Sequence, residues 1–233
     1  MPLFWPATMP RRLALFDLDN TLLAGDSDHA FGEFLIRKRL VDDADAHRRK
    51  NDEFYEDYRR NRLNIEAYVA FTLGPILHLD QPGREKLQAE FTAEVLSTMV
   101  PTAAMELVDK HRDDFDYCVI ITATNSFITT PIANSFKVDL LLATETEESN
   151  GKLTGRIRGI PCYREGKVLR LEEWLKSASS PQSLSLEGSI FYSDSSNDLP
   201  LLELVAEPVV VNGDARLSAI ATERGWRQLS LHQ

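Results

Sequence analysis

The hydrophobic positions of this chain form two kinds of pattern. Short continuous apolar runs are typical of strands buried on both faces, and apolar residues at every third or fourth position are typical of amphipathic helices. After Pro101 the two patterns alternate, as a parallel sheet with covering helices requires. The apolar runs predict a strand that ends at Asp17 and further strands at residues 117–121, 139–144, 189–193 and 208–211. The helical spacing predicts helices at residues 102–112, 127–136, 166–176, 199–205 and 215–224.

Residues 26–96 differ from the rest of the chain, because charged residues interleave with apolar ones and β-branched runs are scarce. The spacing predicts only helices here, at residues 29–40, 46–62, 65–77 and 84–99. A small hairpin is expected at residues 151–158, and a Ser/Pro-rich surface loop at residues 177–185.

These elements predict an α/β fold with two domains. A Rossmann-like parallel sheet with helices on both faces would be formed by residues 1–24 and 97–233. A small all-helical cap domain, residues 25–96, would be inserted after the first strand. The insertion leaves from the carboxyl end of a strand, where open α/β sheets bind their ligands, so it is placed as a lid would be.

Composition narrows the partners and the location. The formal net charge of −10 repels a nucleic-acid backbone or an anionic membrane surface. No window approaches the roughly 20 apolar residues that span a bilayer, and the basic pair after apolar residues 1–10 stands in the wrong order for a secretory signal. The two cysteines, Cys118 and Cys162, lie apart and lack neighbouring metal ligands, which favours a reducing cytoplasm.

The first strand ends in two carboxylates, Asp17 and Asp19. Because side chains alternate along a strand, residues two apart share a side. Two acidic groups at the carboxyl end of a strand in an α/β fold form a natural site for Mg²⁺ and phosphate. The same pattern also serves as a turn or a helix cap, so its meaning depends on what lies near it.

Three further polar clusters follow the predicted order of the fold. They are Thr122 with Asn125, Lys167 at the start of a helix, and Asp194 with Asn197 and Asp198. The carboxyl ends of parallel strands meet at one sheet edge, so all four clusters are expected to come together there. A nucleophilic carboxylate, a hydroxyl, a cation and further carboxylates suit phosphoryl transfer, which depends mostly on positioning and charge neutralisation.

Each cluster also has a structural interpretation. Thr122 is an ordinary β-branched strand residue, and Lys167 taken alone is a solvated surface lysine. Asp194 and Asp198 are typical of a helix cap and an acidic first turn. Their order and placement together favour the chemical interpretation.

The motifs resemble the four motifs of the haloacid dehalogenase superfamily. They are Asp17-Leu18-Asp19-Asn20-Thr21, an apolar strand that ends in Thr122, then Lys167, then Asp194-Ser195-Ser196-Asn197-Asp198. The match spans the whole predicted core. The insertion after the first motif is similar to the subgroup that includes phosphoserine phosphatase, and within it to bacterial hydrolases proposed to act on histidinol phosphate. The resemblance implies a metal-dependent phosphomonoesterase.

The resemblance also implies a role for each motif. Asp17 would attack phosphorus and form an aspartyl-phosphate, and Asp19 would protonate the leaving alcohol and then activate water. Mg²⁺ would bind the Asp17 carboxylate, the Asp19 backbone carbonyl and Asp194. The phosphate oxygens would be held by Thr122, the backbone N–H of Ala123, Lys167 and Asn197, with Asp198 behind them.

Two departures from phosphoserine phosphatases bear on the substrate. Thr122-Ala123-Thr124 stands where those enzymes usually have Ser-Gly-Gly, and residues 66–72 hold no arginine for a substrate carboxylate. Asp26, nine residues after Asp17, stands where those enzymes carry an acid for the substrate ammonium, although it is equally typical of a helix cap. An amino alcohol phosphate such as histidinol phosphate therefore fits better than phosphoserine, unless Arg59, Arg60 or Arg62 supplies the cation.

Other functions stay open at this point. A phosphoserine phosphatase, a phosphotransferase or a mutase of the same fold would use the same motifs. A phosphoacceptor receiver module combines similar residues, but in a domain about half this size, with the phosphorylated Asp in mid-chain and no helical cap after it. We expect solvated surface positions for the scattered histidines, namely His29, His47, His78, His111 and His232.

Overall fold

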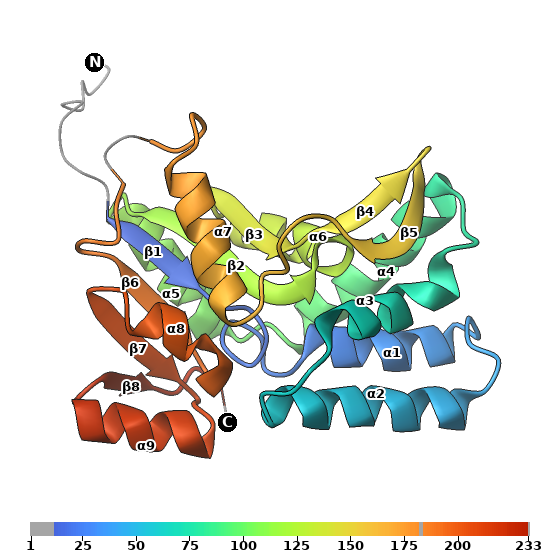
Figure 1. The fold of residues 1–233 in the computed structure, drawn as a ribbon, viewed down its shortest axis with the longest axis horizontal. Helices are drawn as coiled ribbons and strands as arrows, with labels where there is room; N and C mark the ends of the chain where they lie inside the picture. Colours follow the sequence, from blue (N-terminus) through green and yellow to red (C-terminus); the bar gives the residue numbers. More distant parts are fainter. Residues whose placement is uncertain (1–11, 182–183, 233) are drawn as a thin grey trace.

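The computed structural model of the chain describes residues 12–181 and 184–232. In this part of the chain, parallel strands form a 6-stranded sheet in the order β3-β2-β1-β6-β7-β8 (Figure 1), which confirms the predicted α/β fold. Residues 1–10, where we expect no secretory signal, and positions 182 and 183 of the predicted loop lie outside the described residues. The strands are β1 (Leu13–Phe16), β2 (Tyr117–Asn125), β3 (Leu140–Thr144), β6 (Ile190–Ser193), β7 (Glu207–Val211) and β8 (Arg227–Leu229).

Helices cover both faces of this sheet, because alternate residues of each buried strand point to opposite faces. Ala14 and Phe16 belong to the apolar cluster that packs against α5 (Thr102–Asp113) and α6 (Ser126–Phe136). Leu13 and Leu15 belong to the cluster on the other face. That cluster includes residues of α7 (Glu165–Leu175), α8 (Leu199–Leu202) and α9 (Ala215–Arg224).

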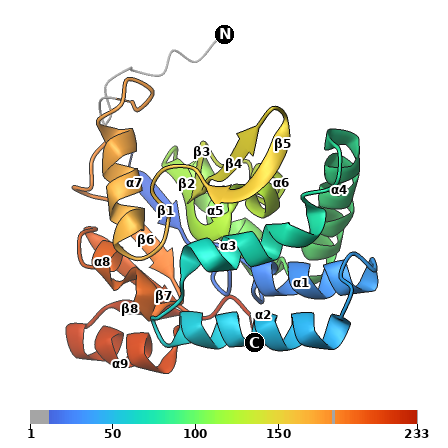
Figure 2. The ribbon, with the colours of Figure 1, turned by 45° about the vertical axis from the view of Figure 1, so that its right-hand side comes forward.

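The residues between β1 and α5 form helices only, within the described part of the chain. They are α1 (Ser27–Arg37), α2 (Ala44–Arg59), α3 (Ile65–Leu73), the short 3₁₀ turn η1 (Gly74–Ile76) and α4 (Gln81–Thr98). In both views α1, α2 and α3 lie together, on the side of the sheet toward which the arrow of β1 points (Figures 1 and 2). No helix in the described ranges is both long and apolar enough to cross a membrane.

Local sequence fixes where these four helices begin. Each starts just after an Asp or Asn whose side chain accepts a hydrogen bond from the N–H three positions later, at 2.8–2.9 Å. This is the N-cap arrangement that satisfies an otherwise unpaired helix donor. The four capping residues are Asp26, Asp43, Asn64 and Asp80.

A buried aromatic cluster joins the inserted helices to the sheet domain. Phe91 of α4 packs against Phe31 and Phe34 of α1, with ring centroids 5.0 and 5.2 Å apart. Phe31 also meets Phe127 of α6 edge-on at 6.1 Å. Such pairs contribute about 0.5–1.5 kcal/mol beyond the area they bury. The cluster therefore fixes the start of α1, which lies next to the end of β1.

Two strands have no apolar run and escape the sequence prediction. β8 follows the polar sequence Arg-Gln-Leu and forms because β7 offers it a free edge. The expected hairpin at residues 151–158 is in fact the second half of a longer one, in which β4 (Thr146–Ser149) pairs antiparallel with β5 (Lys152–Ile157). The β4 sequence Thr-Glu-Glu-Ser carries no hydrophobic signal.

His111 is buried, contrary to the exposed position expected for the histidines. Only 7% of the residue is exposed, and its Nδ1 and Nε2 lie 2.6 Å from Asp116 Oδ2 and 2.8 Å from the Tyr192 hydroxyl. The charged neighbours of His111 in sequence point to the other side of α5, because residues adjacent in a helix do not share a face. Charge along the sequence was therefore a poor guide to burial at this position.

Replacing Phe91 with Ala should destabilise the protein by about 3–5 kcal/mol, because a buried aromatic side chain is lost and a cavity remains. Lys86→Ala on the same helix, where the side chain is 80% exposed, should change the free energy of unfolding by less than about 0.5 kcal/mol. Urea denaturation of both variants measures the difference. Equal effects would show that the aromatic cluster does not hold α4 in place.

Candidate active site

The carboxyl ends of three neighbouring strands hold the predicted polar residues. Asp17 follows β1, Thr122 lies in β2 and Asp194 follows β6. The Asp17 N–H donates to the Tyr192 carbonyl at 2.9 Å, so the β1–β6 pairing continues up to the carboxylate. The structure thus brings these three residues together at one edge of the sheet, because β1 lies between β2 and β6.

Lys167 is buried between two of the predicted carboxylates. Its Nζ lies 2.7 Å from Asp17 Oδ1 and 2.7 Å from Asp198 Oδ2, and the residue is only 1% exposed. Burial alone would lower the pKa of Lys167, but the Asp17 and Asp198 carboxylates raise it above its usual value. The lysine therefore carries its charge inside the protein, which rules out the solvated surface position that it would have by itself.

Thr21 links the two carboxylates that follow β1 and β6. Its hydroxyl oxygen lies 3.4 Å from Asp17 Oδ2 and 3.2 Å from Asp194 Oδ1, and it accepts a hydrogen bond from the Asp194 N–H at 3.0 Å. Burial, together with the charges of Asp17 and Asp198, raises the pKa of Asp194 well above its usual value. The Asp17 and Asp194 carboxylates are thus close neighbours. Lys167 pairs with Asp17, and no ion pair to Asp194 occurs in the described residues.

Asp19 is held by two hydrogen bonds on the other side of Asp17. The Ser27 N–H donates to its Oδ1 at 2.6 Å, and the Thr124 hydroxyl donates to its Oδ2 at 2.7 Å. Burial and the nearby Asp26 charge raise the pKa of Asp19 to about 7. A carboxyl group with that pKa exists in both protonation states near neutral pH, as a group that acts first as an acid and then as a base requires.

Asp26 and Asp28 stand at the start of α1, next to Asp19. Asp26 is the N-cap of α1, so the structural interpretation of this residue holds whatever else it does. Burial raises its pKa, although the bond from the His29 N–H opposes this. Asp28 is 5% exposed, and burial together with the Asp26 and Asp19 charges raises its pKa well above the usual value.

Thr122 and Ala123 lie on β2 at a break in its pairing with β3. The register shifts between Ile121 and Asn125, which frees this part of the strand from the regular ladder. The Thr122 hydroxyl oxygen accepts a hydrogen bond from the Thr124 N–H at 3.2 Å, and all three residues of the Thr122–Thr124 segment line a pocket. This segment therefore lines the same pocket as Asp17.

Asn197, in the short turn η2 (Ser196–Asp198), contacts the inserted helices instead of this pocket. Its Nδ2 donates to the Tyr58 carbonyl at 3.0 Å, and its Oδ1 accepts from the Tyr163 hydroxyl at 3.1 Å. It lines a neighbouring pocket that also contains Asp194. A phosphate contact from Asn197 would require it to exchange one of these bonds.

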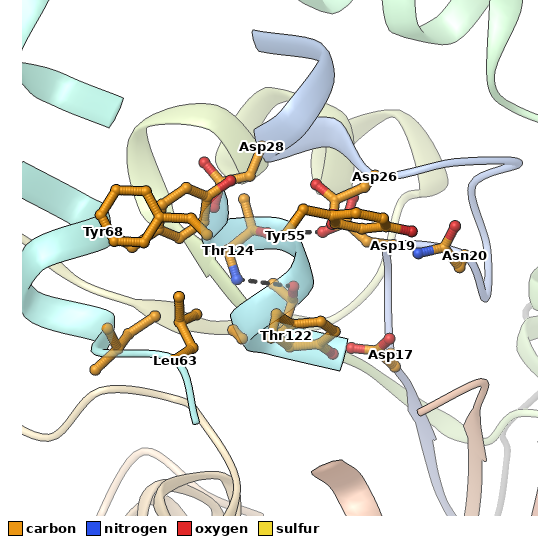
Figure 3. A pocket seen from close by; sticks show the side chains of 14 residues that line it. Asp17, Asp19, Asn20, Asp26, Asp28, Tyr55, Leu63, Tyr68, Thr122 and Thr124 are labelled. Atoms are coloured by element: carbon orange, nitrogen blue, oxygen red, sulfur yellow. Dashed lines mark hydrogen bonds between the residues drawn. The ribbon is translucent and has the colours of Figure 1, made fainter. Parts of the chain in front are cut away.

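The pocket above Asp17 is acidic on one wall and aromatic on the other (Figure 3). It lies between the strand ends and the inserted helices. Asp17, Asp19, Asp26 and Asp28 face rings of α2 and α3, those of Phe54, Tyr55, Tyr58 and Tyr68. No lysine or arginine of the described residues lines it. Any ligand beyond the phosphate group therefore meets carboxylates and aromatic faces.

The charges at the strand ends fit a divalent cation. Asp17 and Asp198 are buried and paired with Lys167, and the half-buried Asp194 lies near both of them, so one ammonium leaves negative charge uncompensated. Carboxylate oxygens are the ligands that Mg²⁺ prefers. Within the described ranges, no group of three or more His, Cys, Asp or Glu side chains is arranged to hold a metal. The expected set consists of two side chains and a backbone carbonyl, so it does not need such a group.

Four residues of the site were not assigned a role from the sequence. Thr21, Thr124 and Asp28 contact the predicted carboxylates or lie beside them, and Tyr58 covers them from α2. Thr124 is two positions from the predicted Thr122, but its partner Asp19 is 105 positions away. Asp28 is two positions from Asp26, where an acid in a first helical turn is ordinary.

Comparison with known proteins agrees with this geometry. Residues 14–203 match the haloacid dehalogenase-like hydrolase family. The chain is 41% identical to a histidinol-phosphatase of Neisseria meningitidis serogroup C, over 94% of this chain and 99% of that protein. It is 30% identical to the phosphoserine phosphatase SerB1 of Mycobacterium tuberculosis, over 91% of this chain and 68% of that protein.

Solved structures show the same fold. A protein of unknown function from Bordetella pertussis superposes with a TM-score of 0.87 and 42% identity, over 96% of this chain and all of that one. A substrate-bound phosphoserine phosphatase superposes with a TM-score of 0.68 at 15% identity, over 97% and 95% of the two chains. The chain therefore belongs to the haloacid dehalogenase-like hydrolases and is a phosphatase of this family.

Proposed function

We propose that this protein is a Mg²⁺-dependent phosphomonoester hydrolase that acts through an aspartyl-phosphate on a small amino alcohol phosphate, best represented by histidinol phosphate. The observation that carries the proposal is the Lys167 ammonium buried between Asp17 and Asp198, at a sheet edge that also holds Thr122 and Asp194. The family match and the helices inserted after β1 favour a phosphatase over a receiver module.

Asp17 is the proposed nucleophile. Its carboxylate attacks phosphorus, the bond from phosphorus to the alcohol oxygen breaks, and the alcohol leaves with a proton from Asp19. Lys167, the Thr122 hydroxyl and the Ala123 N–H hold the phosphate oxygens during this transfer. Asp19, now ionised, takes a proton from water, and that water attacks phosphorus, which releases inorganic phosphate and restores Asp17.

The Asp17 and Asp194 carboxylates and the Asp19 backbone carbonyl are the proposed holders of Mg²⁺, and Asp198 keeps Lys167 in place. Mg²⁺ supplies neutralisation of the phosphate charge when it is bound. The Thr21 hydroxyl oxygen lies 3.4 Å from Asp17 Oδ2 and 3.2 Å from Asp194 Oδ1, so the two carboxylates face the same space. Asn197 would assist at the phosphate only after exchanging its bond to Tyr58 or Tyr163.

The pocket lining supports an amine-bearing substrate without a carboxylate. Asp26 offers a half-buried carboxylate to an ammonium group, and no lysine or arginine of the described residues lines this pocket. The candidate arginines form exposed ion pairs: Arg59 and Arg60 pair with Glu56, and Arg62 pairs with Asp57, with side chains 58–64% exposed. Arg59 lines the neighbouring pocket that contains Asp194, and not this one. Phosphoserine is the second candidate, supported by the fold of the phosphoserine phosphatase structure.

Asp17→Asn should lower kcat by about a thousandfold or more, because an amide cannot form the phosphorylated intermediate. Release of inorganic phosphate from histidinol phosphate in the presence of Mg²⁺ measures the loss. Asp113→Asn, which changes an exposed carboxylate at the end of α5, should retain full activity. Undiminished turnover by the Asp17 variant would refute the nucleophile assignment. If the wild type consumes the ester without releasing inorganic phosphate, the phosphoryl group is transferred to another alcohol instead of water.

Mg²⁺ should raise the Tm of the protein by about 5 °C at a concentration a hundredfold above its Kd, because binding to the folded state relieves the repulsion among buried carboxylates. Thermal unfolding with EDTA or with added Mg²⁺ measures this shift without any substrate. Asp194→Asn should lose most of the shift, whereas Asp113→Asn should keep it. An unaltered shift in the Asp194 variant would contradict its role as a metal ligand.

Asp26→Asn should raise KM for histidinol phosphate about tenfold and leave KM for p-nitrophenyl phosphate unchanged, because only the first ester carries an ammonium group. Asparagine is as good an N-cap as aspartate, so α1 keeps its start and the charge alone is removed. Steady-state kinetics on both esters, with phosphoserine as a third, test the assignment. Equal changes for all three esters would speak against ammonium recognition.

A further inference from the structure

Asp28 lies at the end of the pocket that is remote from Asp17, beside Tyr68 (Figure 3). It is a pocket-lining carboxyl group of which only 5% is exposed. Asp28 accepts a hydrogen bond from Asn125 Nδ2 at 3.3 Å, a hydrogen bond from the Thr124 side chain lowers its pKa, and no ion pair to it occurs in the described residues. A carboxylate offers about four acceptor positions, so these bonds leave some of them free to meet a ligand.

The surroundings of Asp28 hold it in a fixed place. It stands in the first turn of α1, directly after the N-cap residue and Ser27. Asn125 caps α6 with its Oδ1, which accepts from the Ile128 N–H at 3.3 Å, and this turns its Nδ2 toward Asp28. Two helix starts therefore orient the carboxyl group. An acid that only stabilised the α1 dipole would do so equally well in solvent, where ionisation of the carboxyl group costs less free energy.

Aromatic side chains of the inserted helices face this carboxyl group. Tyr68 of α3 is 8% exposed, and after burial the charge of Asp28 contributes most to raising the pKa of its hydroxyl. Phe54 of α2 packs against Tyr68, with ring centroids 5.1 Å apart. A flat ring with N–H groups can bind in such a place, because its face stacks on the aromatic side chains and its edge donates to the carboxylate.

The two acids of α1 differ in their distance from the reacting atoms. Asp26 is the strongest charged neighbour of Asp19, the proposed proton donor to the leaving oxygen. In a 2-amino alcohol phosphate, the ammonium lies two carbons from that oxygen, which suits Asp26. A group attached further along the alcohol reaches the end of the pocket that is remote from Asp17, where Asp28 and Tyr68 lie.

We infer that Asp28 and Tyr68 form a subsite for a planar nitrogen base of the substrate, such as an imidazole ring, while Asp26 takes the ammonium. The inference rests on the proposed function and specifies its substrate class as phosphate esters of amino alcohols that carry such a ring. The pKa of Asp28, raised by burial and by the Asp26 and Asp19 charges, agrees with a carboxyl group whose cationic partner comes from the ligand.

Asp28→Asn tests the subsite with three esters: histidinol phosphate, phosphoethanolamine, which has the amine but no ring, and p-nitrophenyl phosphate, which has no cation. The variant should lower kcat/KM for histidinol phosphate at least tenfold and change the other two less than threefold. Asp42→Asn, at an exposed position before α2, is the matched control and should change none of them. A loss of the same size on all three esters would overturn the inference, because it would indicate a general structural role.

A measurement on the unaltered protein covers the case in which the variant does not fold. Free histidinol should inhibit hydrolysis of p-nitrophenyl phosphate at concentrations at least tenfold lower than ethanolamine does, because only histidinol carries the ring. Equal inhibition by the two amines would overturn the subsite even if histidinol phosphate is hydrolysed. Failure of the protein with Mg²⁺ to release phosphate from any of the three esters would instead refute the proposed function, and the subsite with it.

Discussion

The ion pairs of Lys167 are the interaction on which the rest of the site depends. A carboxylate removed from water without a partner costs several kcal/mol, and this edge of the sheet buries several of them within a few ångströms. The ammonium lies 2.7 Å from both Asp17 and Asp198, so one cation from α7 offsets charges from the end of β1 and from η2. Its ion pairs are with Asp17 and Asp198 and not with Asp194 or Asp19, and the remaining negative charge makes this edge suitable for a divalent cation and a phosphate.

The helices inserted after β1 supply the remaining side chains that line the pocket. These side chains differ in kind from those at the strand ends. The helices contribute two acids at the start of α1 and aromatic rings from α2 and α3, and no basic side chain in the described part of the chain reaches the pocket. We therefore propose that the sheet edge suits any phosphate ester, whereas the inserted helices select the alcohol. This division explains why the motifs of the strands identify the reaction but leave the substrate open.

The fold followed from the sequence wherever an element buries an apolar face. The continuous runs at β1, β2, β3, β6 and β7 and the caps of the inserted helices are local signals. β8 and β4 were missed because their residues are polar and their strand conformation depends on a neighbouring edge. His111 was placed wrongly for a related reason, since its burial is set by the face of α5 that meets the sheet and not by its charged neighbours in sequence.

The sequence by itself determined the order of the chemical groups. Asp17, Thr122, Lys167 and Asp194 each follow or open an element with a clear hydrophobic pattern, and the parallel α/β arrangement brings such positions to one edge. Only the tertiary structure decided which group meets which. The bond from Thr124 to Asp19, the direction of Asn197 toward Tyr58 and the burial of Asp28 beside Tyr68 join residues 40 to 139 positions apart. No local periodicity records such contacts, because they depend on how the inserted helices pack against the sheet.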